Sequence, residues 1–204
     1  MYTLIGNPLN RSFRVLWTLE ELGVPYTLEP EQPQSEAMRS ANPSGKAPAL
    51  RVDADGATVI DSAAICTFLA DRHGALTHTA GSLARAQQDS FLHFALDDLD
   101  GSLWTLAKHS FVFPKEHRNK DAIRSGVAWD LKRAIAAFDT RCGAGPWLTG
   151  DTFTVADLVT VHCIQWMTRA GSVQPSEAMR ALSTRASARP AYQRADAIRQ
   201  DTAG

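Results

Sequence analysis

The chain has 204 residues, of which 44% are hydrophobic and 21% are charged, an ordinary balance for a globular protein with a packed core. Its formal net charge of -1 leaves no basic excess to neutralise phosphates, so we expect no nucleic-acid partner. No apolar run approaches the roughly 20 residues that a membrane span needs, and the first residues resemble a strand rather than a signal peptide; we expect a cytoplasmic protein with no membrane partner.

The first 74 residues alternate between strand-like and helix-like patterns. The expected strands cover residues 2–5, 26–28, 49–52 and 58–60, and the expected helices cover 15–22 and 35–39, with a third that begins at Asp61 or Ser62 and closes at Gly74. The order is therefore βαβ followed by ββα. The first two strands should pair in parallel, because a helix separates them and provides the crossover connection.

From Ser82 onward the patterns are helical only. One apolar stripe ends near Trp104 and a second runs over residues 123–138, which predicts two antiparallel helices. The stripe over 83–104 is wider than one helix of the same chain would cover. It contributes to our expectation of a homodimer.

The segment FTVADL, residues 153–158, carries a helix-start signal with a known mechanism. Thr154 is the expected N-cap, and the Asp157 carboxylate, three residues later, can bond back to it in a capping box. Phe153 and Leu158 are placed to pack together as a hydrophobic staple. The helix that follows is apolar almost all round, so we expect it at the centre of the second half.

The cysteines and histidines show neither disulfide nor metal-site spacing. Cys66, Cys142 and Cys163 are an odd, widely separated set without a C-x-x-C pair, which indicates buried, reduced thiols in a reducing compartment. The six histidines lack a pattern such as H-x-x-x-H, so we assign no metal.

The chain resembles the glutathione transferase superfamily over essentially its whole length. Four segments carry the resemblance, in family-like order and separation: RVLWTLEELGVPY (14–26), NPSGKAPAL (42–50), DSAAI (61–65) and FTVAD (153–157). The resemblance implies an α/β plus all-α fold, with a thioredoxin-like glutathione-binding domain over residues 1–76 and an all-helical domain over 82–204. It does not select one class within the superfamily.

The resemblance also implies a glutathione site. It predicts a cis bond between Ala47 and Pro48, a rare isomer, with the Ala47 backbone open to the cysteinyl part of glutathione. Ser62 would bind the γ-glutamyl carboxylate at a helix entrance, Asp61 would assist with the α-amino group, and Lys46 would meet the glycine carboxylate. A turn without a ligand at Ala47, plain capping by Asp61 and Ser62, and a solvated Lys46 are the alternatives.

The loop NPLNRSFR, residues 7–14, is the expected site of thiol activation, because only the thiolate is a good nucleophile. Lowering a thiol pKa from about 8.5 to about 7 requires about 2 kcal/mol, and one hydrogen bond to a charged group supplies about 1.5–3 kcal/mol. Related sequences often have Ser where this chain has Asn10, and no Cys stands in the loop, which disfavours a glutaredoxin-like mechanism. We predict Asn10 as the main donor and Ser12 as the second; a backbone N–H as donor, or simple helix capping, are the alternatives.

The implied activity is that of a glutathione transferase with a role in detoxification. The protein would bind reduced glutathione as co-substrate and direct its thiolate at a small electrophile, or use it to reduce a peroxide or disulfide. The electrophile would lie between the domains, near Leu9, Trp104, Lys108, His109 and Phe111. The alternative is a glutathione-binding scaffold or regulatory protein with little or no transferase activity.

Overall fold

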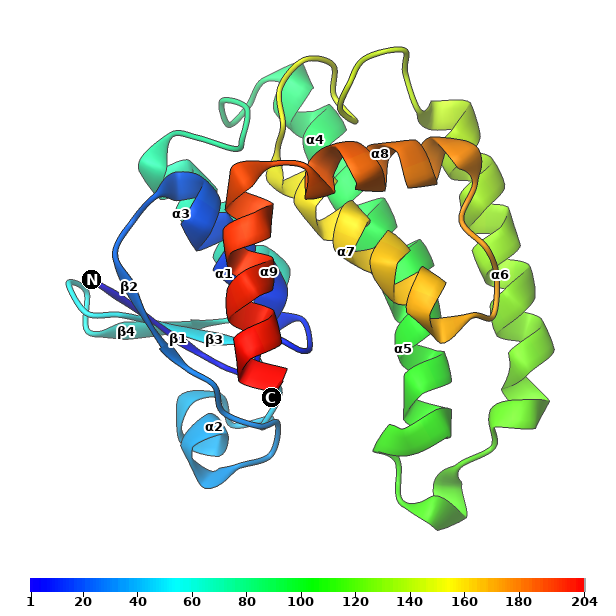
Figure 1. The fold of residues 1–204 in the computed structure, drawn as a ribbon, viewed down its shortest axis with the longest axis horizontal. Coiled ribbons are helices and arrows are strands. Elements are labelled where there is room, and N and C mark those ends of the chain that lie inside the picture. Colours follow the sequence, from blue (N-terminus) through cyan, green and yellow to red (C-terminus); the bar gives the residue numbers. More distant parts are fainter. Residues whose placement is uncertain (204) are drawn as a thin grey trace. The chain divides into compact units, whose positions relative to one another are not determined.

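Four strands form a single sheet in the order β2-β1-β3-β4, which lies at the centre of the first of two units (Figure 1). The structure, a computed structural model, describes residues 1–203. The strands are β1 (Tyr2–Ile5), β2 (Tyr26–Glu29), β3 (Ala49–Val52) and β4 (Ala57–Ile60). β1 pairs in parallel with β2 and antiparallel with β3, and β3 pairs antiparallel with β4. The predicted βαβ-ββα order is confirmed.

Helices cover both faces of this sheet. The helices of the first unit are α1 (Ser12–Leu22), α2 (Glu36–Ala41), α3 (Ser62–His73) and α9 (Pro190–Ala203). α1 and α3 lie on one face and α2 on the other (Figure 1). α1 is buried from Ser12 to Leu19 and ends at Gly23, whose φ of 63° suits a residue without a Cβ. α2 packs through Met38 onto Ile5 and Ala49.

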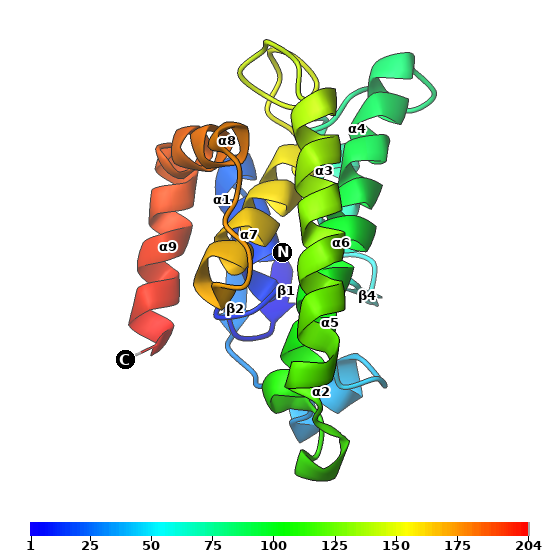
Figure 2. The same cartoon turned by 90° about the vertical axis from the view of Figure 1, so that its right-hand side faces the viewer.

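The second unit runs from His78 to Ala186 and is built from helices. Its elements are α4 (Leu83–Phe94), η1 (Ala95–Asp100), α5 (Gly101–Ala107), η2 (Lys108–Val112), η3 (Lys115–His117), α6 (Lys120–Arg141), α7 (Val155–Ala170) and α8 (Glu177–Ser187). Figure 2 shows α6 alongside the helix formed by α4 and α5. The second-half helical prediction is confirmed, but η1 is a π-helical turn within the first apolar stripe, and η2 is a second π-helical turn beyond the end of that stripe. A π turn adds one residue per turn, and hydrophobic periodicity alone does not reveal it.

α7 is the buried helix that the pattern predicts, and its first turn contains the predicted capping box. Asp157 Oδ2 accepts hydrogen bonds from Thr154 N and Oγ1, both at 2.9 Å. Its other oxygen accepts from Leu148 N at 2.8 Å, which ties the preceding loop to the helix. Burial raises the pKa of Asp157, while these hydrogen bonds oppose the rise.

The last helix, α9, packs against α1 and therefore belongs to the first unit. The contacts group residues from Ser187 onward with Met1–Thr77. The domain limits 1–76 and 82–204 stay a prediction, because a division by compactness does not test where a domain ends. The first unit nevertheless depends on residues from both ends of the sequence.

The cysteines are free thiols, and two of the three are buried. Burial raises the pKa of Cys66 to about 12, so this thiol stays protonated. Cys142 is half-buried, which departs from the expectation for that residue. Residues 1–203 contain no cluster of three or more side chains suited to hold a metal ion. They also contain no helix with the length and apolar character required to cross a membrane.

Candidate functional site

The loop between β1 and α1 is held in place by backbone bonds and one glycine. Gly6 N donates to Glu29 O at 2.8 Å and Asn7 N donates to Glu31 O at 2.9 Å, which fixes the loop beside the end of β2. Gly6 has φ of 141°, and a Cβ there would lie 2.3 Å from Ser12 Oγ and 3.2 Å from the Ala47 Cβ. Only glycine therefore fits where the loop, the start of α1 and the residue before Pro48 meet.

Asn10 and Ser12 form one hydrogen-bonded unit at the start of α1. Ser12 N and Ser12 Oγ both donate to Asn10 Oδ1, at 2.9 and 2.8 Å. Ser12 is fully buried, so its hydroxyl is used inside the protein, whereas Asn10 is partly exposed. Within residues 1–203 the Asn10 Nδ2 group donates to no acceptor. The capping alternative thus accounts for the Asn10 oxygen and leaves its amide N–H groups available.

The turn before β3 brings the predicted backbone site together. The Ala47-Pro48 bond is cis, as predicted. Asn42 Nδ2 donates to Lys46 O at 2.6 Å, and Asn42 Oδ1 accepts from Ser44 N and Oγ at 3.1 and 2.9 Å. In the described part of the chain, the N–H and C=O of Ala47 have no hydrogen-bond partner. These two groups can therefore pair with an extended ligand.

Asn42 is a structural residue of the site that sequence reasoning did not single out. It is 4% exposed and holds the turn from inside. The Asn-Pro-Ser-Gly sequence around it is a turn signal that could have identified it. Lys46, in contrast, is exposed, and its predicted contact with a carboxylate stays a prediction.

The start of α3 combines a cap with a buried hydroxyl. Asp61 has φ of 74°, and its Oδ1 accepts from Ala63 N at 2.9 Å and Ala64 N at 3.1 Å, so one oxygen is used as the N-cap. Ser62 is 3% exposed and its Oγ accepts from Arg14 Nη1 at 3.2 Å. Among the described residues, the Ser62 backbone N–H has no acceptor. A carboxylate at this helix start would meet an N–H donor and the positive end of the helix dipole.

Arg14 is the most important residue that the sequence analysis missed. Its side chain is fully buried in α1 and reaches Ser62 across 48 positions of sequence. Because a guanidinium stays charged even when buried, Arg14 adds positive charge beneath the start of α3. Its charge also acts to lower the pKa of nearby Cys66, against the larger effect of burial. An arginine within a helix stretch that is otherwise apolar, RVLW, was the available signal.

The five residues predicted near the electrophile are divided between the two units, with one in the first unit and four in the second. Leu9 is 57% exposed on the loop of the first unit. In the second unit, Trp104 lies on α5, and Lys108, His109 and Phe111 lie on η2. His109 Nδ1 accepts from Asn119 N at 3.3 Å, and the His109 ring lies edge-on to Phe113 at 5.1 Å, so this histidine is held by its own segment. A shared pocket for the five stays a prediction.

A cavity of about 310 Å³ in the first unit lies away from these residues. It is lined by residues at the N-terminal end of β1 and the C-terminal end of α3, among them Tyr2 and His73. The loop after β1 stands at the opposite end of that strand. None of the predicted site residues lines this cavity.

Comparisons with known proteins match both halves of the chain to one family. The family model described as glutathione S-transferase, N-terminal domain, matches residues 10–72, and the one described as glutathione S-transferase, C-terminal domain, matches residues 121–194. Glutathione S-transferase 4 of Zea mays is 28% identical over 162 residues, which cover 74% of this chain and 71% of that protein. Elongation factor 1-gamma of Trypanosoma cruzi is 28% identical over 178 residues, 82% of this chain, but the match spans only 41% of that protein.

A solved structure agrees with the sequence comparisons. The glutathione S-transferase of a sphingomonad, complexed with glutathione, superposes with a TM-score of 0.80 at 25% identity. The superposition covers 97% of this chain and 98% of that one. The similarity therefore extends over both units.

Proposed function

The chain belongs to the glutathione S-transferase superfamily, and from this premise we propose that it binds reduced glutathione in its first unit and directs the thiolate at a small electrophile. The proposal rests first on the Asn10 side chain. Its oxygen is occupied by two Ser12 donors, and its Nδ2 group is left as a hydrogen-bond donor at a partly exposed position. Such an amide is suited to stabilise an anion beside the loop.

The remaining residues supply a partner for each part of glutathione. Ser62, with Arg14 behind it, would receive the γ-glutamyl carboxylate through its backbone N–H. The Asp61 oxygen that does not cap the helix would accept from the α-amino group. The Ala47 backbone would pair with the cysteinyl residue, and Lys46 would meet the glycine carboxylate.

The chemistry proposed is nucleophilic substitution or addition by sulfur. The Asn10 Nδ2–H would donate to the thiolate and favour loss of the thiol proton to solvent. The sulfur lone pair would then form a bond to an electrophilic carbon. In a substitution the displaced group would leave with the bonding electron pair, and in an addition the displaced π electron pair would take up a proton from solvent. In a variant of the proposal, the thiolate would attack a peroxide oxygen or a disulfide sulfur and displace an alkoxide, hydroxide or thiolate, and a second glutathione would complete the two-electron reduction by forming glutathione disulfide. We further propose a cytoplasmic homodimer that acts in detoxification.

A second candidate function is a glutathione-binding scaffold or regulatory protein with little turnover. Its support is the similarity to elongation factor 1-gamma over 82% of the chain. The free donor at Asn10 favours the enzyme, because a protein that only binds glutathione needs the open groups at Ala47 and Ser62 but needs no donor for the thiolate.

Retention on immobilised glutathione, followed by a turnover screen, tests the proposal. The screen should contain aryl halides, epoxides, peroxides and mixed disulfides as separate reactions with reduced glutathione. Retention with turnover of at least one class is the expected result. Retention without turnover would support the scaffold, and absence of both would refute glutathione binding. Light scattering at micromolar concentration tests the dimer, which a monomer mass would contradict.

A further inference from the structure

The last helix runs antiparallel along α1 and reaches the end that carries Asn10. Three pairs define the register: Arg189 contacts Glu21, Tyr192 contacts Trp17, and Arg199 contacts Phe13. Residue numbers rise in α9 while they fall in α1. The later turns of α9 therefore lie beside the start of α1, as Figure 1 also shows.

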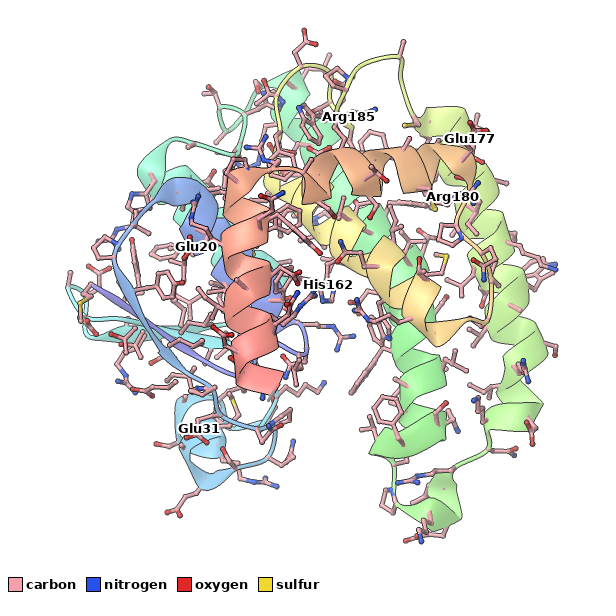
Figure 3. The ribbon with its side chains drawn as sticks, viewed as in Figure 1. Glu20, Glu31, His162, Glu177, Arg180 and Arg185 are labelled. Atoms are coloured by element: carbon pink, nitrogen blue, oxygen red, sulfur yellow. The ribbon has the colours of Figure 1, made fainter. Side chains whose placement is uncertain are left out.

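Ionic contacts anchor α9 at the far end of α1. Arg189 Nε and Nη2 bind the two oxygens of Glu21 at 2.6 and 2.7 Å, and Glu21 Oε1 also accepts from Trp17 Nε1 at 2.9 Å. The Glu20 carboxylate, labelled in Figure 3, accepts from Arg194 Nε at 2.7 Å and from Tyr26 Oη at 2.6 Å. Bidentate pairs of this kind fix orientation as well as proximity.

Aromatic and cationic contacts hold the near end. The Tyr192 ring lies edge-on to Phe13 with centroids 5.6 Å apart, and the Arg199 guanidinium lies 4.3 Å from the centre of the Phe13 ring. Arg199 is itself oriented by Asp196, one turn earlier in α9. Phe13 is 1% exposed and directly follows Ser12, whose N–H and O–H hold the Asn10 oxygen.

We propose that Arg199 and Tyr192 are positioning residues for thiol activation: they hold Phe13 from α9 and thereby fix the direction of the Asn10 amide. This inference rests on the proposed function, since it concerns the same donor. Neither residue needs to touch glutathione. A small displacement of a donor weakens a hydrogen bond steeply with distance and angle, so the position of α1 matters for the bound anion.

The test compares two arginines of the same helix. Arg199→Ala removes the contact on Phe13, whereas Arg194→Ala removes the Glu20 pair at the opposite end of α1. The readout is the ultraviolet absorbance of the bound glutathione thiolate, titrated against pH, together with the melting temperature and the KM for glutathione. Arg199→Lys serves as the conservative variant, because it retains a cation that can lie over the Phe13 ring.

For Arg199→Ala we expect the thiolate pKa to rise by about half a unit, so that about threefold less thiolate forms at a pH below the pKa. The KM for glutathione should change little, and Arg199→Lys should restore most of the shift. Arg194→Ala should lower the melting temperature and leave the titration at its wild-type position. Equal titrations for Arg199→Ala, Arg194→Ala and the wild type would refute the inference and leave the proposed function standing. Absence of any thiolate absorbance in the wild type would refute both.

Discussion

A side-chain oxygen accepts both a backbone N–H and a hydroxyl at the start of α1 and at the start of α7, but the two side chains differ in the polar atoms that remain unpaired. In α7, both oxygens of Asp157 are occupied by donors from Leu148 and Thr154, and the carboxylate is buried. In α1, the Asn10 oxygen is occupied by Ser12, but the other half of the side chain is an unpaired donor at a partly exposed position. A side chain whose polar atoms are all paired inside the protein has a structural role, whereas one with an unpaired donor at a partly exposed position can also bind a ligand.

The largest effect should come from removal of the structural cap. Asp157→Ala leaves the buried N–H groups of Leu148 and Thr154 without acceptors, at a cost of about 1–3 kcal/mol for each unsatisfied group. We expect a large fall in melting temperature, while glutathione affinity per folded molecule stays unchanged. Asp151→Ala, at an exposed position of the same loop, is the matched control. A wild-type melting temperature with lost glutathione affinity would reverse the assignment.

The second-largest effect is expected when the unpaired Nδ2 donor of Asn10 is removed. Asn10→Ala should raise the pKa of bound glutathione by about one unit and slow conjugation about tenfold at neutral pH, as expected for the loss of one modest charge-assisted bond. Asn10→Asp sharpens the comparison, because it retains an acceptor for Ser12 and replaces the donor by an anionic oxygen. It should raise the thiolate pKa further than Asn10→Ala does. Asn10→Ser should retain activity or improve it, since a hydroxyl offers a donor.

These titrations also discriminate among the three possible donors. If Asn10→Ala leaves the thiolate titration unmoved while Ser12→Ala shifts it, Ser12 is the main donor. If neither substitution moves it, backbone N–H groups stabilise the anion and both side chains act only in the turn. Thiolate absorbance against pH, measured on the saturated complex, provides each result.

A smaller effect is expected for Ser12→Ala. The Ser12 hydroxyl is buried and donates to Asn10, so its loss should act on glutathione only through Asn10. We expect a pKa shift of less than half a unit and a loss of stability of about 0.5–1.5 kcal/mol, the usual net value of one hydrogen bond. Urea unfolding and the same absorbance titration measure the two quantities. A pKa shift larger than that of Asn10→Ala would contradict the comparison.

The smallest effect is a pH dependence at Asp157. Burial raises its pKa in the folded protein above the value in the unfolded chain, so the folded state binds the proton more tightly. The stability that protonation contributes is fully present below the unfolded pKa and is lost as pH rises through the folded pKa. The difference in unfolding free energy between the wild type and Asp157→Asn should therefore move in favour of the wild type as pH falls from 7 to 4. Urea unfolding at each pH measures it, and a constant difference would contradict the raised pKa.

Local features of the fold could be predicted from the sequence because their determinants are close in the chain. The capping box at Thr154 and Asp157 involves two side chains three residues apart, and the order of strands and helices along the first unit follows from periodicity and turn residues. The cis bond at Ala47-Pro48 came from family resemblance rather than from local physics. The π turns in η1 and η2 were missed, since one extra residue hardly disturbs an apolar stripe.

The candidate site was predicted only in part, because some of its contacts join residues that are far apart in the chain. Asn10 and Ser62 stand in recognisable segments, but the contact of Arg14 with Ser62 depends on the packing of α1 against α3. Likewise, the close approach of Ser12 to Gly6 is a distance that spacing in sequence does not give. Polar atoms that are paired inside the protein can be distinguished from polar atoms that are free to bind a ligand only when their hydrogen-bond partners are known.

The antiparallel contact of α9 with α1 has a consequence for how the protein is made. On the ribosome, the chain segment with Phe13 and Trp17 is made before the second unit, yet these side chains contact Tyr192 and Arg199, which are made only after it. At about 5–20 residues per second, the interval between them lasts roughly 10–40 seconds. During that time the residues of the second unit are synthesised, and the cover that α9 gives to Phe13 and Trp17 is still missing. The half of the chain that is translated first therefore gains its last native contacts only after the second half has been made.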